Sequence, residues 1–243
     1  MQAVRLLPHL FLVNSLTPEG SPLPTCYSYA LDAPAGFVFI DCGSHRAWPL
    51  FLEGWKRLQI EDRPWIAAFL THYHGDHSLA GPAFQARGAR LYAHPYTAEV
   101  LATQIERAFG PIGTDEVGPF SVDVRVQDGE RVAVAGQELE MVYTPGHTLG
   151  CLSLLTTVDG RRCLFTGDLI LDRGRLGFCG SHGFSAQSVL ASLQKCARRD
   201  FDLLLGGHHC ATRGARACIE RGIARGEKDL WASQIAGPRT KRR

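Results

Sequence analysis

The chain has 243 residues and a formal net charge of +2, with 26 basic and 24 acidic residues. Hydrophobic residues make up 45% of it and charged residues 21%, the composition of an ordinary globular protein. The near-neutral charge argues against a nucleic acid as partner. Since no uninterrupted apolar stretch reaches the ~20 residues of a transmembrane helix, we expect no membrane span.

Eight cysteines are scattered along the chain without a Cys-x-x-Cys pair. They are too sparse for a disulfide-stabilised scaffold, which favours reduced thiols and a cytoplasmic location. The sequence does not indicate an oligomeric state.

The first part of the chain predicts strands followed by helices. The strands are expected at residues 4–13, 26–31, 36–43, 65–71 and 90–93, with a turn-rich loop at 17–24. The run at 36–43 is apolar until it meets Asp41 and Gly43, as a buried strand is where it ends at a site. Helices are expected at 48–58, 79–87 and 95–109, before a Gly/Pro linker at 110–119.

The second part repeats the order of strands and then helices. Period-two alternation from 121 to 165, broken by turns such as Asp128-Gly129, predicts consecutive antiparallel strands in a second sheet. A Gly-rich loop at 172–183, a helix at 185–197, a strand at 201–205 and a closing helix from Thr212 follow. This order predicts a mixed α/β (α+β) fold, a four-layer αββα sandwich, in a single domain of residues 1–243.

One segment concentrates metal-binding chemistry: residues 71–77 read Thr-His-Tyr-His-Gly-Asp-His. Three imidazoles and a carboxylate directly after a buried strand are typical of a divalent metal site. His72 and His74 can point the same way from an extended chain. Asp76 and His77 fall on the next turn, so the spacing indicates two metal ions.

The same side-chain types recur later at His147, Asp168 and His208, each after a predicted strand. A glycine precedes each of them, which would allow close backbone approach to a bound ion. Five histidines and two carboxylates therefore form a candidate set of seven ligands, with positions left open for substrate. His209 adjoins His208 and is the alternative ligand there.

These residues resemble the metallo-β-lactamase-fold metallohydrolases. The similarity comprises the His-x-His-x-Asp-His motif, the three later residues in the family's order and the strand at 39–43, so it covers most of the chain. It implies an αββα sandwich of the metallo-β-lactamase type with the metals at one edge of the two sheets. It also implies a ligand set of His72, His74 and His147 for the first ion and Asp76, His77 and His208 for the second, with Asp168 bridging.

The resemblance implies a metal-dependent hydrolase that attacks a thioester, ester or lactone carbonyl with a hydroxide bridging the two ions. Asp76 is expected to handle a proton in catalysis. Zinc suits the His-rich ligands, with iron and manganese as alternatives. The expected partner is a small-molecule substrate. The true β-lactamases lack the bridging aspartate, so Asp168 argues against lactam hydrolysis.

The sequence is compatible with several enzyme classes of this family. Glyoxalase II is similar in its metal set and in a loop like residues 174–178, although only 34 residues follow His209, fewer than its glutathione-binding segment has. Lactonases that act on acyl-homoserine lactones share the ligand set. Outside these classes, the alternatives are a persulfide dioxygenase with a single iron and a phosphodiesterase or nuclease of the same fold.

Two further segments have two interpretations each. The loop at 172–183, with Phe178, could contact substrate as a lid or simply connect two elements. Residues 211–243 contain nine basic and three acidic side chains, which could attract an anionic substrate or a nucleic acid. A solvated helix face with a frayed end is the interpretation we favour for this basic C-terminal region.

Overall fold

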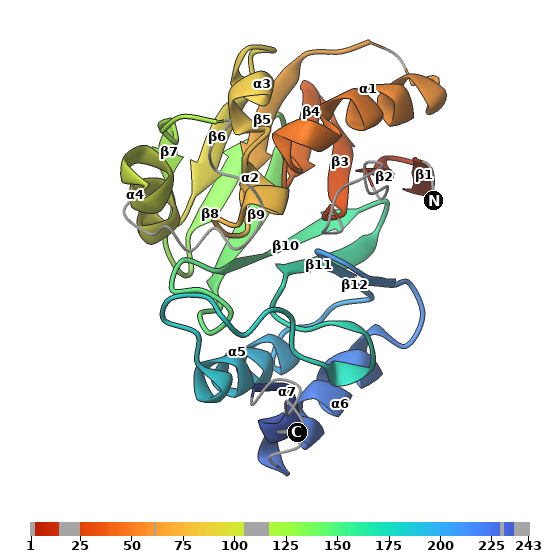
Figure 1. The fold of residues 1–243 in the computed structure, drawn as a ribbon. Helices are drawn as coiled ribbons and strands as arrows, with labels where there is room; N and C mark the ends of the chain where they lie inside the picture. The colour runs from red at the N-terminus through yellow and green to blue at the C-terminus, as the bar shows by residue number, and fades with distance from the viewer. Residues whose placement is uncertain (1–2, 15–24, 61, 105–116, 229–230, 236–243) are drawn as a thin grey trace, which may run out of the picture.

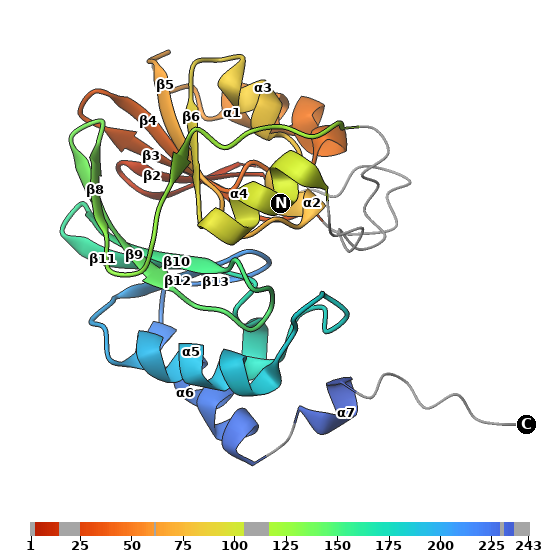
Figure 2. The same cartoon turned by 90° about the vertical axis from the view of Figure 1, so that its left-hand side faces the viewer.

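Two β-sheets stack face to face, and helices cover the outer face of each (Figure 1, Figure 2). The computed structural model describes residues 3–14, 25–60, 62–104, 117–228 and 231–235. The four layers confirm the predicted αββα sandwich. The loop expected at 17–24 lies outside the described residues.

The first sheet contains seven strands in sequence order. They are β1 (Val4–Leu7), β2 (Leu10–Asn14), β3 (Ser28–Ala33), β4 (Gly36–Ile40), β5 (Trp65–Phe69), β6 (Arg90–Ala93) and β7 (Val124–Arg125). Strands β1 to β4 pair antiparallel, whereas β4 to β7 pair parallel. Because parallel neighbours end at the same edge, the segments that follow β4 and β5 meet there.

The second sheet has six strands in the order β13-β12-β11-β10-β9-β8. They are β8 (Arg131–Val134), β9 (Gln137–Tyr143), β10 (Leu152–Val158), β11 (Arg161–Gly167), β12 (Leu203–Gly206) and β13 (Cys210–Ala211). The pairs are antiparallel except that β11 and β12 run parallel. The carboxyl ends of β11 and β12 therefore lie side by side.

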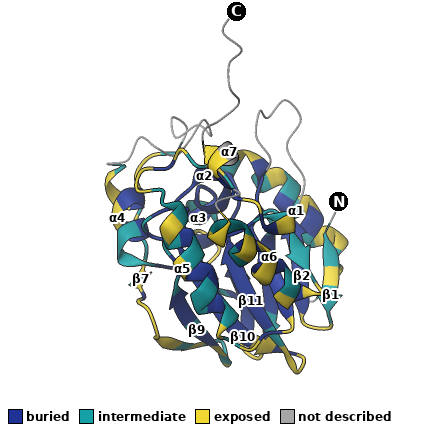
Figure 3. Ribbon diagram, turned by 90° about the horizontal axis from the view of Figure 1, so that it is seen from below, coloured by how far each residue is buried: buried dark blue, intermediate teal, exposed yellow. Residues whose placement is uncertain are grey.

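Two groups of helices form the outer layers. They are α1 (Trp48–Arg57), α2 (Gly75–Ser78), α3 (Gly81–Gln85) and α4 (Pro95–Thr103), then α5 (Ala186–Ala197), α6 (Ala215–Glu227) and α7 (Ala232–Ile235), with single turns η1 (His45–Ala47) and η2 (Asp172–Gly174). Figure 2 shows α1, α3 and α4 on the first sheet and α5 and α6 on the second. Seen from below, α5 and α6 expose one face and cover buried strands (Figure 3). Among the described residues, no helix has both the length and the apolar character that crossing a membrane requires.

Three apolar layers separate the four structural layers. Alternation along β4 explains why its sequence reads as one continuous apolar run. Val38 and Ile40 pack between the two sheets, while Phe37 and Phe39 pack under α1 and α3. Both faces of this strand are buried, so no polar residue interrupts the run. A third cluster joins the second sheet to α5 and α6.

The structure divides two segments differently from the prediction. The run at 4–13, expected as one strand, is an antiparallel hairpin of β1 and β2 that turns at Pro8 and His9. Proline lacks the N–H that a continuous strand would need at this position. The first strand expected after residue 121 is β7, which pairs with β6 in the first sheet. Alternation indicates a strand, but it does not indicate which sheet the strand joins.

Helix boundaries also differ from the prediction. The helix expected at 79–87 is the shorter α3, Gly81–Gln85. Helix α4, expected to run to residue 109, ends at Thr103 because Gln104 adopts a left-handed conformation with φ of 50°. Residues 105–109 lie outside the described part. The closing helix begins at Ala215 rather than Thr212, after Gly214 at a φ of 65°.

Replacing Phe39 by Ala should reduce the free energy of unfolding by about 3 to 5 kcal/mol, because it leaves a cavity in the core. The Phe39 ring is fully buried, 4.5 Å from the ring of Trp65 and 5.1 Å from that of Phe84. Urea denaturation followed by circular dichroism measures the loss. The control is Phe178→Ala, at a side chain that is 50% exposed, which should change stability by less than about 0.5 kcal/mol. Equal losses in both variants would contradict this account of the core.

Candidate metal centre

Four segments meet at one edge of the sandwich and carry all seven predicted ligands. The first runs from the end of β5 through α2, which contains Asp76 and His77. The second links β9 to β10, the third follows β11 and the last links β12 to β13. Their side chains form three overlapping groups whose candidate ligand atoms lie within 4.8 Å of one another. The groups are His72, His74 and His147, then His72, His77 and Asp168, and then Asp76, His77 and His208.

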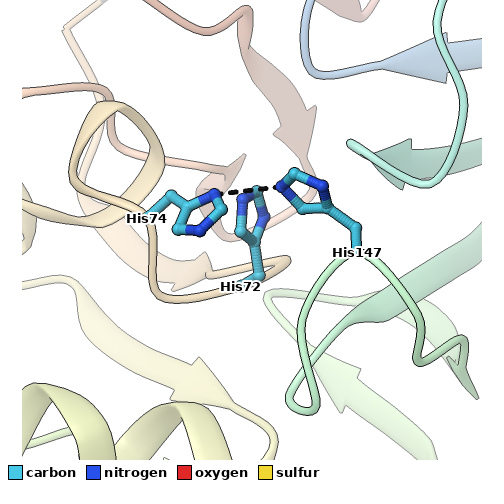
Figure 4. Close-up of side chains that lie close together, drawn as sticks. All are labelled: His72, His74 and His147. Carbon is cyan, nitrogen blue, oxygen red and sulfur yellow. Dashed lines mark hydrogen bonds between the residues drawn. The ribbon is translucent and has the colours of Figure 1, made fainter. Parts of the chain in front are cut away.

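The first group is a trio of buried imidazoles, which Figure 4 shows converging from two loops. His74 Nδ1 lies 3.0 Å from His147 Nε2, and the His72 ring centre is 4.7 and 4.9 Å from the other two. Burial, together with the neighbouring His147, lowers the pKa of His74 to about 3. Burial also holds the pKa of His72 well below its usual range. The trio is therefore neutral and offers lone pairs.

The other two groups combine imidazoles with carboxylates. His208 Nε2 lies 3.2 Å from Asp76 Oδ2 and 3.3 Å from Asp168 Oδ2. Burial opposes protonation of His208, but the two carboxylates outweigh it and raise the pKa of His208 to about 10. Asp168 Oδ2 is also 3.6 Å from His147 Nε2, so this carboxylate lies between the two groups.

Asp41, which follows β4, orients two of the histidines. Its carboxylate accepts hydrogen bonds from the Thr71 backbone N–H and hydroxyl, at 2.7 and 2.8 Å, and lies 2.7 Å from His77 Nδ1. The Thr71 hydroxyl, which donates to Asp41, can accept from His72 Nδ1 at 3.1 Å. Nδ1 of each ring thus faces a hydrogen-bond acceptor, and Nε2 of His72 and of His77 is left facing the cluster.

Sequence reasoning identified Asp41 only as the end of a buried strand and did not assign Thr71 a role. Asp41 has a φ of 58°, a backbone conformation uncommon outside glycine, which is often found at functional sites. Cys26 is also close, in a group with Asp41 and His77. Burial raises the pKa of the Cys26 thiol to about 11, so it remains protonated. The one sequence signal for the contact between Asp41 and His77 was an unbroken apolar strand that ends in Asp-Cys-Gly.

Gly146, Gly167 and Gly207 were expected to let the backbone approach the metal site closely, and the structure places only Gly207 in such a position. A side chain at Gly207 would come within 2.3 Å of Asp168 Oδ1 and 2.5 Å of the His77 ring, so only glycine allows this loop so close to the site. Gly146 instead packs against the backbone of Val189 in α5. Gly167 packs against the Thr71 side chain.

The remaining candidate histidines lie outside these groups. His209 Nε2 is 3.6 Å from Cys218 Sγ in α6, whereas His208 faces the two carboxylates. His94 is the N-cap of α4, where its side chain accepts a hydrogen bond from the Tyr96 N–H, and its ring stacks on Tyr143. The geometry thus favours His208 over His209 and gives His94 a structural role.

The loop at 172–183 borders the imidazole trio. Ser181 is buried, and its Oγ lies 3.0 Å from His74 Nε2. The Phe178 ring is half exposed and its centre is 6.2 Å from that of His74. Sequence reasoning assigned no role to Ser181, because nothing in the sequence indicates a contact across 107 residues.

The donor atoms fit a divalent metal ion such as zinc. Within the described part of the chain, the buried atoms His72 Nε2, His77 Nε2 and Asp168 Oδ1 make no hydrogen bond. Leaving such atoms buried without a partner is costly, and a cation would satisfy them. Imidazole nitrogens and carboxylate oxygens are also the ligands that zinc accepts.

Comparison with known proteins supports this chemistry. The model of the family described as "Metallo-beta-lactamase superfamily" matches residues 22–208. A hydroxyacylglutathione hydrolase of Stenotrophomonas maltophilia is 32% identical over 84% of this chain and 67% of its own length. A probable polyketide biosynthesis zinc-dependent hydrolase, BaeB, of Bacillus velezensis is 30% identical over 53% of this chain and 49% of its own length. The chain thus spans about half to two thirds of these curated relatives.

Solved structures share the fold. A metallo-beta-lactamase of Cronobacter sakazakii, a mutant of its HARLDQ motif, superposes with a TM-score of 0.73 at 22% identity, covering 98% of this chain and 100% of the other. The FEZ-1 metallo-beta-lactamase of Legionella gormanii gives a TM-score of 0.73 at 18% identity and covers 98% of each chain. At these identities the likeness concerns the fold alone.

Replacing Asp41 by Asn should weaken zinc binding by about 10- to 100-fold, because the amide has one acceptor oxygen for three donors and no longer orients His77. Competition with a chromophoric chelator measures the affinity. Asp159→Asn is the matched control, since Asp159 pairs with His9 at 2.6 Å outside the cluster. Unchanged zinc affinity in Asp41→Asn would refute the orienting role.

Proposed function

Because the chain belongs to the metallo-beta-lactamase superfamily, we propose that it is a metal-dependent hydrolase of a thioester, ester or lactone. We propose two divalent ions, zinc in preference to iron or manganese, and a small molecule as substrate. The observation that carries the proposal is the convergence of seven candidate ligand side chains, six of them buried, from four segments of the chain.

The ligands divide into two sets of three around one carboxylate. His72, His74 and His147 would hold one ion, and Asp76, His77 and His208 the other. The contacts of Asp168 Oδ2 with His147 and His208 support a bridging position. A pair of divalent ions supplies water that ionises near neutral pH and a Lewis acid for the carbonyl oxygen. No serine or cysteine nucleophile is then required.

Asp76 is the proposed proton carrier. Burial alone would raise its pKa, but His77 and His208 outweigh burial and lower the pKa of Asp76. Its carboxylate is therefore ionised and able to accept a proton. Oδ2 faces His208 at 3.2 Å and His77 at 3.6 Å, so we assign the proton to Oδ1.

We favour hydrolysis over the dioxygenase alternative, and metal content separates the two. A persulfide dioxygenase holds a single iron with two histidines and one aspartate but keeps much of the same motif, whereas we propose that Asp76, His77 and His208 hold a second ion. Both sheets contribute ligands, which supports the hypothesis that residues 1–243 form one domain. Cytoplasmic location remains a prediction.

The loop at 172–183 is the proposed wall of the substrate site. Phe178 is 50% exposed beside His74, and burying its ring against an apolar substrate group would be favourable. The basic C-terminal region is not part of the proposal. Arg216 there donates to the carbonyls of Ala197 and Arg199, and residues 236–243 lie outside the described part.

Elemental analysis followed by a substrate panel tests the function. We expect about two zinc-like ions per chain and turnover of a thioester, ester or lactone rather than a lactam or phosphodiester. The double variant His72→Ala/His74→Ala should lose about a thousandfold or more in kcat/KM, because electrostatic stabilisation of the reacting carbonyl is lost. One iron per chain with oxygen consumption on a persulfide would favour the dioxygenase, and undiminished turnover by the double variant would exclude the proposal.

Replacing Phe178 by Ala should raise KM for a substrate with an apolar acyl group by about tenfold, about 1.4 kcal/mol of lost apolar contact, while kcat changes little. Steady-state kinetics on short and long acyl thioesters measure the effect. Phe178→Leu is the control and should recover most of the affinity for the long chain. If Phe178→Ala left both KM values unchanged, the loop would be a plain connector.

A further inference from the structure

The tautomer of each imidazole decides which nitrogen can bind a metal. A neutral imidazole carries one N–H and one lone pair. His72 and His77 each place Nδ1 on a hydrogen-bond acceptor, Thr71 or Asp41, and turn Nε2 toward the cluster. His74 is reversed, because its Nδ1 faces His147 Nε2 at 3.0 Å. The proton of His74 must therefore lie on Nε2 for Nδ1 to bind a metal.

Ser181 Oγ lies where it can accept that proton, 3.0 Å from His74 Nε2. The serine side chain is only 6% exposed. Thus the hydroxyl occupies for His74 the place that the Asp41 carboxylate occupies for His77. Metal-binding histidines commonly donate their second N–H to such a partner, which fixes the ring orientation.

The segment around Ser181 also lies against a second member of the trio, His147. The Ser185 N–H donates to the carbonyl of Gly146, directly before His147, at 2.9 Å. A side chain at Gly177 would lie 3.6 Å from the His147 ring. The start of the loop is fixed where Trp231 Nε1 donates to the carbonyl of Gly174 at 3.0 Å. Residues 177–185 therefore pass along both His74 and His147.

We infer that Ser181 is a positioning residue that accepts the Nε2–H of His74, directs Nδ1 to the first metal and makes the order of residues 177–183 depend on that metal. The inference rests on the proposed function, because it assumes a metal in the imidazole trio. Its consequence is that the substrate wall forms fully only when the first ion is bound.

Zinc affinity of the full chain tests the inference through Ser181→Thr and Ser181→Val. These substitutions introduce side chains of the same shape that differ in one hydroxyl. Chelator competition should give Ser181→Thr an affinity close to that of the unchanged chain. Ser181→Val and Ser181→Ala should bind one of the two ions about 10- to 100-fold more weakly. Equal affinities for the Thr and Val variants would overturn the inference.

Ser185→Ala is the matched control from the same segment. The Ser185 hydroxyl accepts from the Ser188 N–H at 3.1 Å as the N-cap of α5 and does not contact a ligand histidine. Its loss should lower the midpoint of thermal unfolding without changing zinc affinity. A loss of zinc affinity equal to that of Ser181→Ala would show a merely structural role for both serines and overturn the inference.

Amide hydrogen exchange supplies a readout that is independent of activity. Zinc should slow exchange at residues 177–183 in the unchanged chain and do so less in Ser181→Val. If zinc slowed exchange equally in the unchanged chain and in Ser181→Val, the inferred coupling between the metal and residues 177–183 would be wrong. The proposed function would survive that result, since two ions would still be bound. If the unchanged chain bound no zinc, iron or manganese, the proposed function would fail and this inference with it.

Discussion

The close packing of five imidazoles and two carboxylates at one edge of the sandwich is the constraint on which the rest of the structure depends. Buried polar atoms without partners oppose folding, so their accumulation is costly unless a cation compensates for them. The pKa values of His74 and His208 move in opposite directions within the cluster. Burial, reinforced by His147, lowers the pKa of His74, whereas Asp168 and Asp76 outweigh burial and raise the pKa of His208. A metal ion at His208 would therefore have to displace a proton from its ring.

The two sheets must keep a fixed relation for this cluster to form, and hydrogen bonds between them contribute to it. The Tyr29 hydroxyl, from the first sheet, donates to the carbonyl of Gly206 at 2.8 Å. The Tyr27 N–H donates to the carbonyl of Gly207 at 2.6 Å. Both contacts hold the loop that carries His208. The stacking of the sheets thus sets how far residues 72–77 lie from His147, Asp168 and His208, which follow strands of the second sheet.

The orienting contacts divide between rigid and peripheral parts of the fold. Asp41 follows a strand whose two faces are buried, so its position is fixed by the core. Ser181 belongs to a connecting loop with an exposed Phe178. Under the proposed function, the metal chemistry therefore depends on the core and the choice of substrate on a loop.

The sequence by itself determined the layers and the family and predicted seven ligand positions, because buried strands, turn residues and the His-x-His-x-Asp-His motif are local patterns. Only the tertiary structure decided that β7 joins the first sheet, that His208 rather than His209 faces the carboxylates, and that Asp41 and Ser181 lie against His77 and His74. These features depend on contacts across 36 to 107 residues or on sheet pairing. Local periodicity carries no information about such distances, because it reports which face of an element is buried and not what lies against it.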